Sequence, residues 1–476
     1  MDSLLGHFAD AVQAFPDRIA IVDGKGRQTS FAALEGRAHK LAAHWQGRGV
    51  QPGDRVLMAM PVTADLYASL AALWSLGATV ILPEPAMGLA GLRHAARTAK
   101  ATAFCAAGMF RALQYALPEL WRCTRLRQKD GDAGGFDAHM PEADDIALIS
   151  FTSGTTGKPK AIPRSHGFLM AQFRAIDPLL ASDRPERDLV AFPVFTLINI
   201  ASGRTSVLPN WKMSRLASLA PGPLQNWLKK QDVTRALVPP ALCRVLADCA
   251  RPEAFHTVFT GGGPVFPDLV DDLLAKGPMR IVCVYGSTEA EPIAHLDIGD
   301  VSEADRADML QGKGLLVGHH GAETMVRIEA DEILVAGAHV NKGYLDPAHD
   351  AENKQRCGDV IWHRTGDAGL LDENGRLWLL GRVGSSVRSD TGVLYPFCVE
   401  VAARQWPGVA QVALMPDGSG ALLVVEGDGR YMADWRKRAQ GFGIKGVQHV
   451  KKIPMDRRHA SKIDRKALAN RINQGR

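Results

Sequence analysis

Short apolar runs alternate with stretches of helical periodicity over residues 1 to about 145. This alternation predicts βα units around a largely parallel sheet, with strands at "RIAIVD", "RVLMAM", "ATVILP" and "ATAFCAA". The pattern resumes after residue 150, at "DLVAFPVF", "RALVPP", "HTVFTGGG" and "RIVCVYGSTEA". From residue 326 the apolar runs become shorter, as in "MVRIEADEILVAG", and "DENG" predicts a hairpin turn. The chain therefore reads as an α/β protein.

The pattern changes after Arg382, where "VGSSVRSDTG" consists mainly of small and polar residues. Two apolar strands, "VAQVALMP" and "GALLVVEG", follow together with helical stretches. A chain of 476 residues also exceeds what one hydrophobic core usually supports. We therefore predict a large N-terminal domain over 1–382 and a small α+β domain over 383–476, joined by a linker.

Residues 66–83, "LYASLAALWSLGATVILP", are uncharged and about as long as a short membrane span. They are also rich in Ala, Ser and Gly, and Gly77 would end a helix. The segment is therefore predicted to be a helix, a turn and a buried strand, and the protein to have no integral membrane segment.

The composition is that of a globular protein, with 46% hydrophobic and 22% charged residues and a net charge of +5. The most basic stretch is residues 450–476, which fits a nucleic-acid or membrane-surface tail or, more simply, a solvated helix. Seven cysteines form no CxxC pair and no metal-binding spacing. Reduced thiols and the absence of a basic, apolar leader at residue 1 predict a cytoplasmic enzyme.

Residues 149–166, "ISFTSGTTGKPKAIPRSH", have the composition of a phosphate-binding loop. A Walker loop needs four residues between its first Gly and the Gly-Lys pair, but only Thr155 and Thr156 separate Gly154 from Gly157. Pro159 follows the lysine and disfavours a helix. The loop is therefore predicted to lead into an extended segment. Its glycines, hydroxyls and lysines can still bind an anion, although a simple surface loop would look similar.

Further motifs follow in a fixed order: "TGGGPV" (260–265), "VYGSTEAEP" (284–292), "HRTGDAG" (363–369), "LLGRVGSSV" (379–387) and "RRHASKIDR" (457–465). With the loop, they resemble the adenylate-forming (ANL) superfamily of acyl- and aryl-CoA ligases, peptide adenylation domains and luciferases. The resemblance implies a large domain of stacked α/β subdomains and a small mobile C-terminal domain. It also implies ATP and Mg²⁺ as cofactors, with the active site between the two domains.

The resemblance assigns roles to individual residues. The positions implied to bind the phosphates of ATP are Thr152, Ser153, Gly154, Thr155, Thr156, Gly157, Lys158 and Lys160. Those implied to bind adenine and ribose are Gly261, Gly262, Gly263, Tyr285, Gly286, Asp367 and Arg382. On their own, Tyr285 could be a core aromatic and Asp367 a turn residue.

Three residues are implied to be catalytic. Lys462 would reach the α-phosphate and the attacking carboxylate from the small domain, which is electrostatic catalysis. Glu289 would bind Mg²⁺, and Thr288 a phosphate oxygen; Glu291 is a rival oxygen ligand, but the family pattern selects Glu289. No nucleophilic triad is needed, because the substrate is itself a carboxylate anion.

The stretch "AFPVFTLINIASG" occupies the place of the acyl pocket. It lacks the Asp with which peptide adenylation domains hold an amino group, so an α-amino acid substrate is not expected. The stretch could equally be a buried strand. The candidate pocket residues are Phe192, Phe195, Thr196 and Asn199.

The second step stays open between two acceptors. One is a thiol, of CoA or of a phosphopantetheinyl carrier protein, with rotation about Gly384 in place of the usual acidic hinge residue. The other is the substrate's own hydroxyl, because "YGSTEAEPIA" and "WHRTGDAGLLDENGRLWLLGR" resemble the β-lactone synthetases of olefin biosynthesis. That branch would add other enzymes of its pathway as partners. The chain is short for it.

Two further classes compete with an enzyme. A nucleotide-binding scaffold that has lost catalysis is a remote alternative, because Glu289 and Lys462 are both present. A nucleic-acid binder is not expected, because no aromatic-interleaved basic patch accompanies the C-terminal charges.

Overall fold

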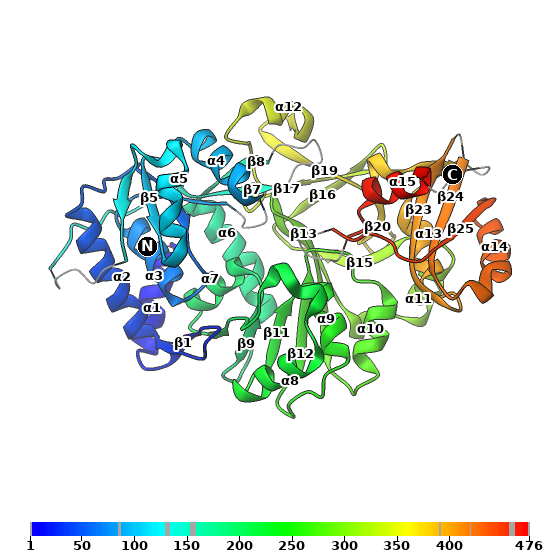
Figure 1. Ribbon diagram of the computed structural model, residues 1–476, viewed down its shortest axis with the longest axis horizontal. Helices are drawn as coiled ribbons and strands as arrows, with labels where there is room; N and C mark the ends of the chain where they lie inside the picture. Colours follow the sequence, from blue (N-terminus) through cyan, green and yellow to red (C-terminus); the bar gives the residue numbers. More distant parts are fainter. Residues whose placement is uncertain are drawn as a thin grey trace.

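The computed structural model describes residues 2–83, 87–128, 134–152, 159–389, 392–418, 420–456 and 462–474. A large N-terminal part holds two extended sheets and their helices, and a small C-terminal part lies at one end of the molecule (Figure 1). The fold is thus mixed α/β with a large and a small domain, as the sequence predicted.

The first sheet has six strands. In spatial order they are β6 (Thr124–Leu126), β5 (Ala103–Ala106), β3 (Arg55–Ala59), β4 (Thr79–Leu82), β7 (Ile146–Thr152) and β8 (Lys160–Ser165). All pairs are parallel except β7 with β8. The consecutive residues Val56, Leu57 and Met58 are all buried, because helices cover both faces of this sheet.

The second sheet contains fourteen strands of the described chain. Its parallel part runs from β1 (Ile19–Val22) through β10 (Thr205–Val207), β9 (Arg187–Val190), β11 (Arg235–Val238) and β12 (Thr257–Gly261) to β13 (Arg280–Ser287), with β2 (Gln28–Ser30) at its edge. Its antiparallel part continues through β14 (Ala290–Asp297), β15 (Leu315–His320), β20 (Arg376–Arg382), β19 (Val360–Leu371), β17 (Glu332–Ala336) and β16 (Met325–Glu329), and β18 (Lys354–Cys357) pairs with β19.

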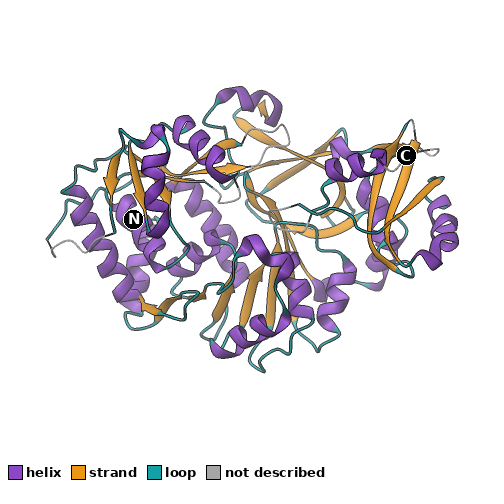
Figure 2. Ribbon diagram, in the orientation of Figure 1, coloured by secondary structure: helices purple, strands orange, loops and turns teal. Residues whose placement is uncertain are grey.

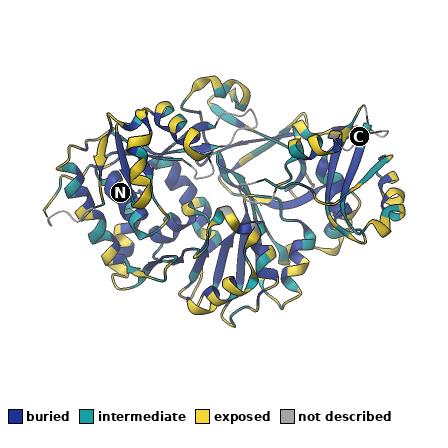
Figure 3. Cartoon of the chain, viewed as in Figure 1, coloured by how far each residue is buried: buried dark blue, intermediate teal, exposed yellow. Residues whose placement is uncertain are grey.

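Helices form layers around these sheets (Figure 2). The layer that packs against both sheets consists of α1 (Leu4–Ala14), α2 (Phe31–Gln46), α3 (Ala64–Ser75), α6 (His166–Ile176) and α7 (Pro193–Ala201). Outer helices are α4 (Gly88–Thr98) and α5 (Leu113–Ala116) on the first sheet, and α8 (Pro221–Lys230), α9 (Pro240–Ala247) and α10 (Pro267–Leu274) on the second. The central strands are buried between these layers (Figure 3). The remaining helices of the large part are α11 (Glu303–Leu310) and α12 (Asp350–Asn353).

The small part has its own core. A three-stranded sheet of β23 (Val409–Asp417), β24 (Gly420–Gly427) and β25 (Gly446–Val450) packs against α13 (Pro396–Ala403), α14 (Met432–Gln440) and α15 (Arg465–Gln474). The hairpin β21 (Val387–Ser389) and β22 (Gly392–Leu394) precedes it. The boundary at 382/383 stays a prediction, although β20 ends at Arg382.

One ion pair joins the small part to α10 of the large part. Arg404 donates to both carboxylate oxygens of Asp268, at 2.9 Å and 2.6 Å. Close by, the rings of Phe266 and Phe397 meet edge to face at 5.5 Å. The interface therefore combines a charged and an aromatic contact.

Several local predictions are confirmed and one is wrong. Residues 66–83 form the end of α3, a turn at Gly77 with φ of +70°, and β4. None of the helices in the described residues is long and apolar enough to cross a bilayer. The "DENG" turn joins β19 to β20. However, β1 does not join the sheet of the other N-terminal strands, because it pairs with β10 of the second sheet.

Asp188→Ala should destabilise the large domain strongly. Asp188 is fully buried on β9, accepts bonds from Arg235 Nε at 2.7 Å and Nη2 at 2.9 Å, and also accepts one from Asn199. Its removal leaves the buried Arg235 guanidinium with the Leu180 carbonyl at 2.9 Å and the Glu186 carboxylate at 3.8 Å in place of a bidentate ion pair, which costs ~3 kcal/mol. Urea denaturation followed by tryptophan fluorescence measures the loss in the free energy of unfolding. Asp183→Ala, at an exposed position, is the control, and equal stability of both variants would contradict the assignment.

Candidate active site

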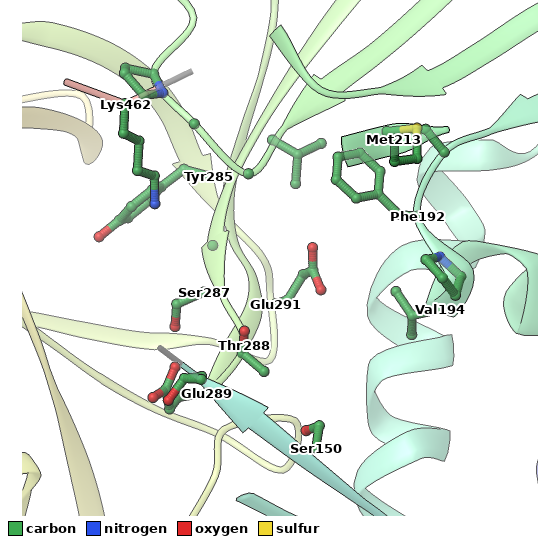
Figure 4. Close-up of a pocket in the computed structure, with 18 of the residues that line it drawn as sticks. Ser150, Phe192, Val194, Met213, Tyr285, Ser287, Thr288, Glu289, Glu291 and Lys462 are labelled. Carbon is green, nitrogen blue, oxygen red and sulfur yellow. The ribbon is translucent and has the colours of Figure 1, made fainter. Parts of the chain in front are cut away.

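One large cleft, with a volume of ≈ 2130 Å³, lies where the two sheets and the small domain meet. Its walls come from the ends of β7 and β8, the turn after β12, the end of β13, the turns around β19 and β20, and the small domain. It is the place to which most of the sequence-predicted site residues converge (Figure 4).

The structure describes the two flanks of the predicted phosphate loop, and phosphate binding itself stays a prediction. Thr152 ends β7 and Lys160 begins β8, and the two residues are paired across the hairpin and line the cleft. The extended segment predicted after Pro159 is confirmed as β8. Residues 153–158, with Ser153, Gly154, Thr155, Thr156, Gly157 and Lys158, lie outside the described residues.

Three predicted nucleotide-binding residues form a hydrogen-bonded group. The hydroxyl of Tyr285 donates to Asp367 Oδ2 at 2.8 Å, and Arg382 Nε lies 3.2 Å from Asp367 Oδ1. Asp367 and Arg382 are paired residues of β19 and β20, so sheet register brings them together. Burial, and then the nearby Asp367 carboxylate, raise the pKa of Tyr285 well above its ordinary value. Tyr285 therefore stays a neutral donor.

The predicted glycines allow close contacts between backbone segments near Tyr285. A Cβ atom on Gly261 would lie 2.3 Å from the carbonyl oxygen of Val284, and one on Gly286 would lie 2.9 Å from that of Ala290. Gly262 has a φ of +75°, which strongly favours glycine. Gly262, Gly263 and Gly286 line the cleft. Gly261 instead lies at a small neighbouring cavity.

Glu289 faces the cleft at the turn between β13 and β14. The hydroxyl of Tyr344 donates to its Oε1 at 3.0 Å, and the backbone carbonyl of Glu289 accepts from Asn341 N at 2.7 Å. Burial and the adjacent Glu289 raise the pKa of Tyr344. The arrangement fixes the carboxylate of a residue that lines the cleft (Figure 4).

Buried basic groups lie beside Glu289. Lys160 donates to Asn353 Oδ1 at 3.1 Å, and its Nζ lies 5.4 Å from the centre of the Tyr344 ring. Lys354 donates to the carbonyl of Asn341, and burial lowers its pKa to about 8. These amines provide positive charge next to the phosphate-loop hairpin.

Arg164 and Glu291 form a second polar group, deeper in the cleft. Arg164 on β8 is buried and donates from Nη2 to the carbonyl of Thr288 at 2.6 Å, which fixes the turn that carries Thr288 and Glu289. Burial lowers the pKa of Arg164, and the nearby Glu291 and Glu289 oppose that shift. Burial raises the pKa of Glu291, with Arg164 opposing.

The acyl-pocket candidates separate into two kinds. Phe192 lines the cleft just before α7, at an edge-to-face distance of 5.8 Å from Phe195. Phe195 faces the small neighbouring cavity instead. Thr196 and Asn199 are fully buried outside the cleft lining, and Asn199 is bonded to Asp188, so packing explains both positions. Most of the stretch forms helix α7 rather than a buried strand. Pro193 is the first residue of this helix, a position that proline favours.

The small domain contributes Lys462 to the cleft. The Lys462 side chain points into the cleft that Tyr285 also lines (Figure 4), and its backbone N–H donates to Asp456 Oδ1 at 2.8 Å. Gly384 also lines the cleft, within the short turn Val383–Ser385. A Cβ atom at Gly384 would meet no atom within 4 Å, so close packing does not require glycine there.

Sequence reasoning missed several polar residues of the cleft. Tyr344 and Arg164 act through backbone or side-chain bonds that no local motif specifies. The hydroxyls of Ser150 and Ser287 are buried without a hydrogen-bond partner among the described residues, and both residues line the cleft. In the sequence, the position of Ser150 and Ser287 next to recognised motifs could have indicated that they belong to the site.

With this geometry established, comparison with known proteins identifies the class. The sequence model of the AMP-binding enzyme family matches residues 8–345, which is more than half of the chain. The protein therefore belongs to the AMP-binding enzyme family, as its motifs indicated.

The chain is also similar to individual proteins over most of its length. An olefin beta-lactone synthetase of Xanthomonas campestris is 29% identical, and the match covers 95% of this chain and 94% of that protein. A 2-succinylbenzoate–CoA ligase of Geobacillus kaustophilus is also 29% identical, over 84% of this chain and 81% of that ligase. The first alignment spans 525 positions, so that relative has residues that this 476-residue chain lacks.

Solved structures agree on the fold. The O-succinylbenzoate coenzyme A synthetase of Bacillus subtilis, in complex with ATP and magnesium ion, has a TM-score of 0.79 at 21% identity, covering 97% of this chain and 99% of that one. An amide bond synthetase of Marinactinospora thermotolerans has a TM-score of 0.80 at 22% identity, covering 98% and 99%. The arrangement of a large and a small domain is thus that of known adenylating enzymes.

His363→Asn should weaken the acid sensitivity of the folded state. Burial, and then Lys354, lower the pKa of His363 to about 3 from its ordinary 6.5. The unfolded chain therefore binds a proton that the folded chain rejects, and stability falls as the pH drops from 6.5 towards 3. At pH 5 this amounts to ~2 kcal/mol. Urea midpoints at pH 7.5 and pH 5 measure it. The exposed His320→Asn should keep the wild-type slope, and an equal slope in all three proteins would refute the effect.

Proposed function

We propose that this enzyme activates a carboxylic acid with ATP, forming an acyl-adenylate and releasing pyrophosphate. A carboxylate oxygen attacks the α-phosphorus, and the bond from that phosphorus to the bridging oxygen of pyrophosphate breaks. One observation carries the proposal: the Tyr285–Asp367 group, Glu289, Lys160 and Lys462 all line one cleft, although they are spread along the chain from residue 160 to residue 462.

The nucleotide end would lie against Tyr285. Its ring offers a flat face for adenine, and the glycines at 262–263 allow the base to approach the backbone. Asp367 already accepts from Tyr285 and lies close to Arg382, but a carboxylate has further lone pairs, so ribose hydroxyls could bind as well. Both neighbours thereby orient Asp367 towards the sugar.

The residues present fit a magnesium nucleotide. Mg²⁺ takes few protein ligands and completes its shell with phosphate oxygens and water. Glu289 provides one carboxylate, held by Tyr344, and the described residues contain no cluster of three or more ligating side chains that would suggest a metal bound by protein alone. When bound, the ion would neutralise phosphate charge. The main chain around Thr288, fixed by Arg164, sets where that carboxylate stands.

The substrate carboxylate and ATP are both anions and repel each other, and positive charge in the cleft reduces this repulsion. Lys160 lies at the phosphate-loop hairpin, and Lys462 enters from the opposite, small domain. A charged amine placed where negative charge develops stabilises the transition state more than the ground state. We propose that Lys462 bridges the substrate carboxylate and the α-phosphate in this way.

For the second step, the first candidate is acyl transfer to a thiol of CoA or of a phosphopantetheinyl carrier protein. The thiol sulfur forms a bond to the acyl carbon, the carbon–oxygen bond to AMP breaks, and the thiol proton leaves. The 2-succinylbenzoate–CoA ligase relative supports this acceptor. Rotation of the small domain about Gly384, where an added Cβ atom would meet no atom within 4 Å, would expose the acyl-adenylate to the thiol.

The second candidate is lactone formation. Here the substrate's own hydroxyl oxygen attacks the acyl carbon, AMP leaves, and the hydroxyl proton is lost, so that the ring closes without a thiol. A specific observation supports it: the olefin beta-lactone synthetase match covers 95% of this chain at 29% identity, although a feruloyl-CoA synthase also matches 92% of this chain at 27% identity. Other enzymes of the same pathway would then be the partners.

We also propose that the enzyme works in the cytoplasm. All seven cysteines are free, and most are buried. Burial raises the pKa of several of these thiols, which keeps them protonated. Unpaired, unreactive thiols suit a reducing compartment.

Lys462→Ala should reduce acid-dependent pyrophosphate exchange by ~10²–10³-fold, because a lost charge contact in the transition state costs ~3–4 kcal/mol. Lys466→Ala is a matched control, since Lys466 is an exposed lysine on α15 that is not in the cleft lining. Exchange is measured with labelled pyrophosphate at saturating ATP. Undiminished exchange in the Lys462 variant would remove its proposed role, and wild-type exchange itself excludes the inactive-scaffold alternative.

The acceptor is determined by products rather than by exchange. Turnover with ATP and a panel of fatty, β-hydroxy and aryl acids is followed by mass spectrometry, with and without CoA. Under the thiol proposal, acyl-CoA accumulates and turnover stops without CoA. Under the lactone proposal, turnover continues without CoA and the product is lighter than the acid by one water.

A further inference from the structure

The acyl side of the cleft contains a carboxylate. Glu291 on β14 points its carboxylate towards the wall lined by Phe192, Val194 and Met213 (Figure 4). An aliphatic chain in this place would meet a polar group among apolar ones. Such a group costs folding free energy unless a partner satisfies it.

The described residues satisfy this carboxylate poorly. Within the described residues, the carboxylate accepts a hydrogen bond from Gln172 Nε2 at 3.5 Å, which is a long contact. Gln172, on α6, is almost completely buried, and its Oε1 has no partner within the described chain. Gln172 therefore contacts Glu291 from the side away from the cleft. The Glu291 carboxylate can still accept hydrogen bonds on the cleft side.

The charge behind Glu291 indicates what kind of donor fits. The buried Arg164 guanidinium is close enough to interact electrostatically with Glu291, and its Nε has no partner among the described residues. This cation offsets the carboxylate charge. A neutral donor is therefore favoured over an ammonium group, which the guanidinium would repel.

The distance along the chain indicates where that donor lies on the substrate. Glu289 lies in the turn before β14 and Glu291 is the second residue of that strand, so their Cα atoms can be at most roughly 7 Å apart. Both side chains enter the same cleft (Figure 4). A group bonded to Glu291 would therefore stand only a few atoms from the reacting carboxylate.

We propose that Glu291 is a specificity-determining residue that accepts a hydrogen bond from a hydroxyl group close to the carboxylate of the substrate acid, with Gln172 and Arg164 positioning it. The inference rests on the proposed adenylation and narrows its substrate class to short-range hydroxy acids. It holds for either acceptor in the second step.

The test compares two acids of equal chain length, one with a 3-hydroxyl and one without, in pyrophosphate exchange. Wild type should prefer the hydroxy acid. Glu291→Leu should lower kcat/KM for the hydroxy acid by ~10–100-fold, the effect of losing a hydrogen bond to a charged group, while kcat/KM for the unsubstituted acid stays level or rises. Glu291→Gln, which keeps an acceptor, should retain part of the preference. Phe192→Leu is the matched control, since loss of an apolar contact should affect both acids equally.

Three outcomes would overturn the inference. The first is a parallel fall for both acids in Glu291→Leu, which would indicate a structural role, and thermal melting would show the same loss. The second is wild-type exchange with equal use of both acids, which leaves the adenylation proposal intact. The third is a preference for the 3-amino analogue over the hydroxy acid, which contradicts the neutral donor. Absence of wild-type exchange with every acid overturns the adenylation proposal as well.

Discussion

The cleft depends on the position of β13 within the second sheet. Its upstream neighbour β12 is parallel and its downstream neighbour β14 is antiparallel, so the sheet changes character at this strand. The end of β13 and the turn that follows carry Tyr285, Thr288 and Glu289. Since the parallel part of the sheet ends at this strand, these polar groups lie at its carboxyl end, where they line the cleft.

The rest of the site is built around that strand by long-range pairing. The β19–β20 register places Asp367 beside Arg382, and β8 of the other sheet sends Arg164 to the Thr288 carbonyl. Sheet hydrogen bonds of this kind fix the backbone on several sides at once. These cleft residues are therefore held in place by the large domain, whereas Lys462 comes from the small domain.

The sequence could indicate the fold class, many of the strands and several motifs that line the cleft, because those features are local. Pro159 disfavours a helix and an extended segment follows it, Gly77 follows the end of a helix, and the motif around Tyr285 was found by its resemblance to a known family. Other features could not be predicted from the sequence, because they depend on contacts between separate elements. The pairing of β1 with β10 joins positions far apart in sequence, and the burial of Asn199 depends on its distant neighbour Asp188. The bond from Tyr344 to Glu289 is of the same kind.

The ion pair between Arg404 and Asp268 has a consequence for timing. If α13 turns with the small domain about residues 383–385, the guanidinium must leave the carboxylate, and both charges must be hydrated again. The pair then behaves as a latch whose strength falls with ionic strength, because screening weakens the contact as it opens. The rate at which the small domain changes position would then depend on a contact of α10, away from the proposed nucleotide site. That contact could change in evolution without any change in the cleft.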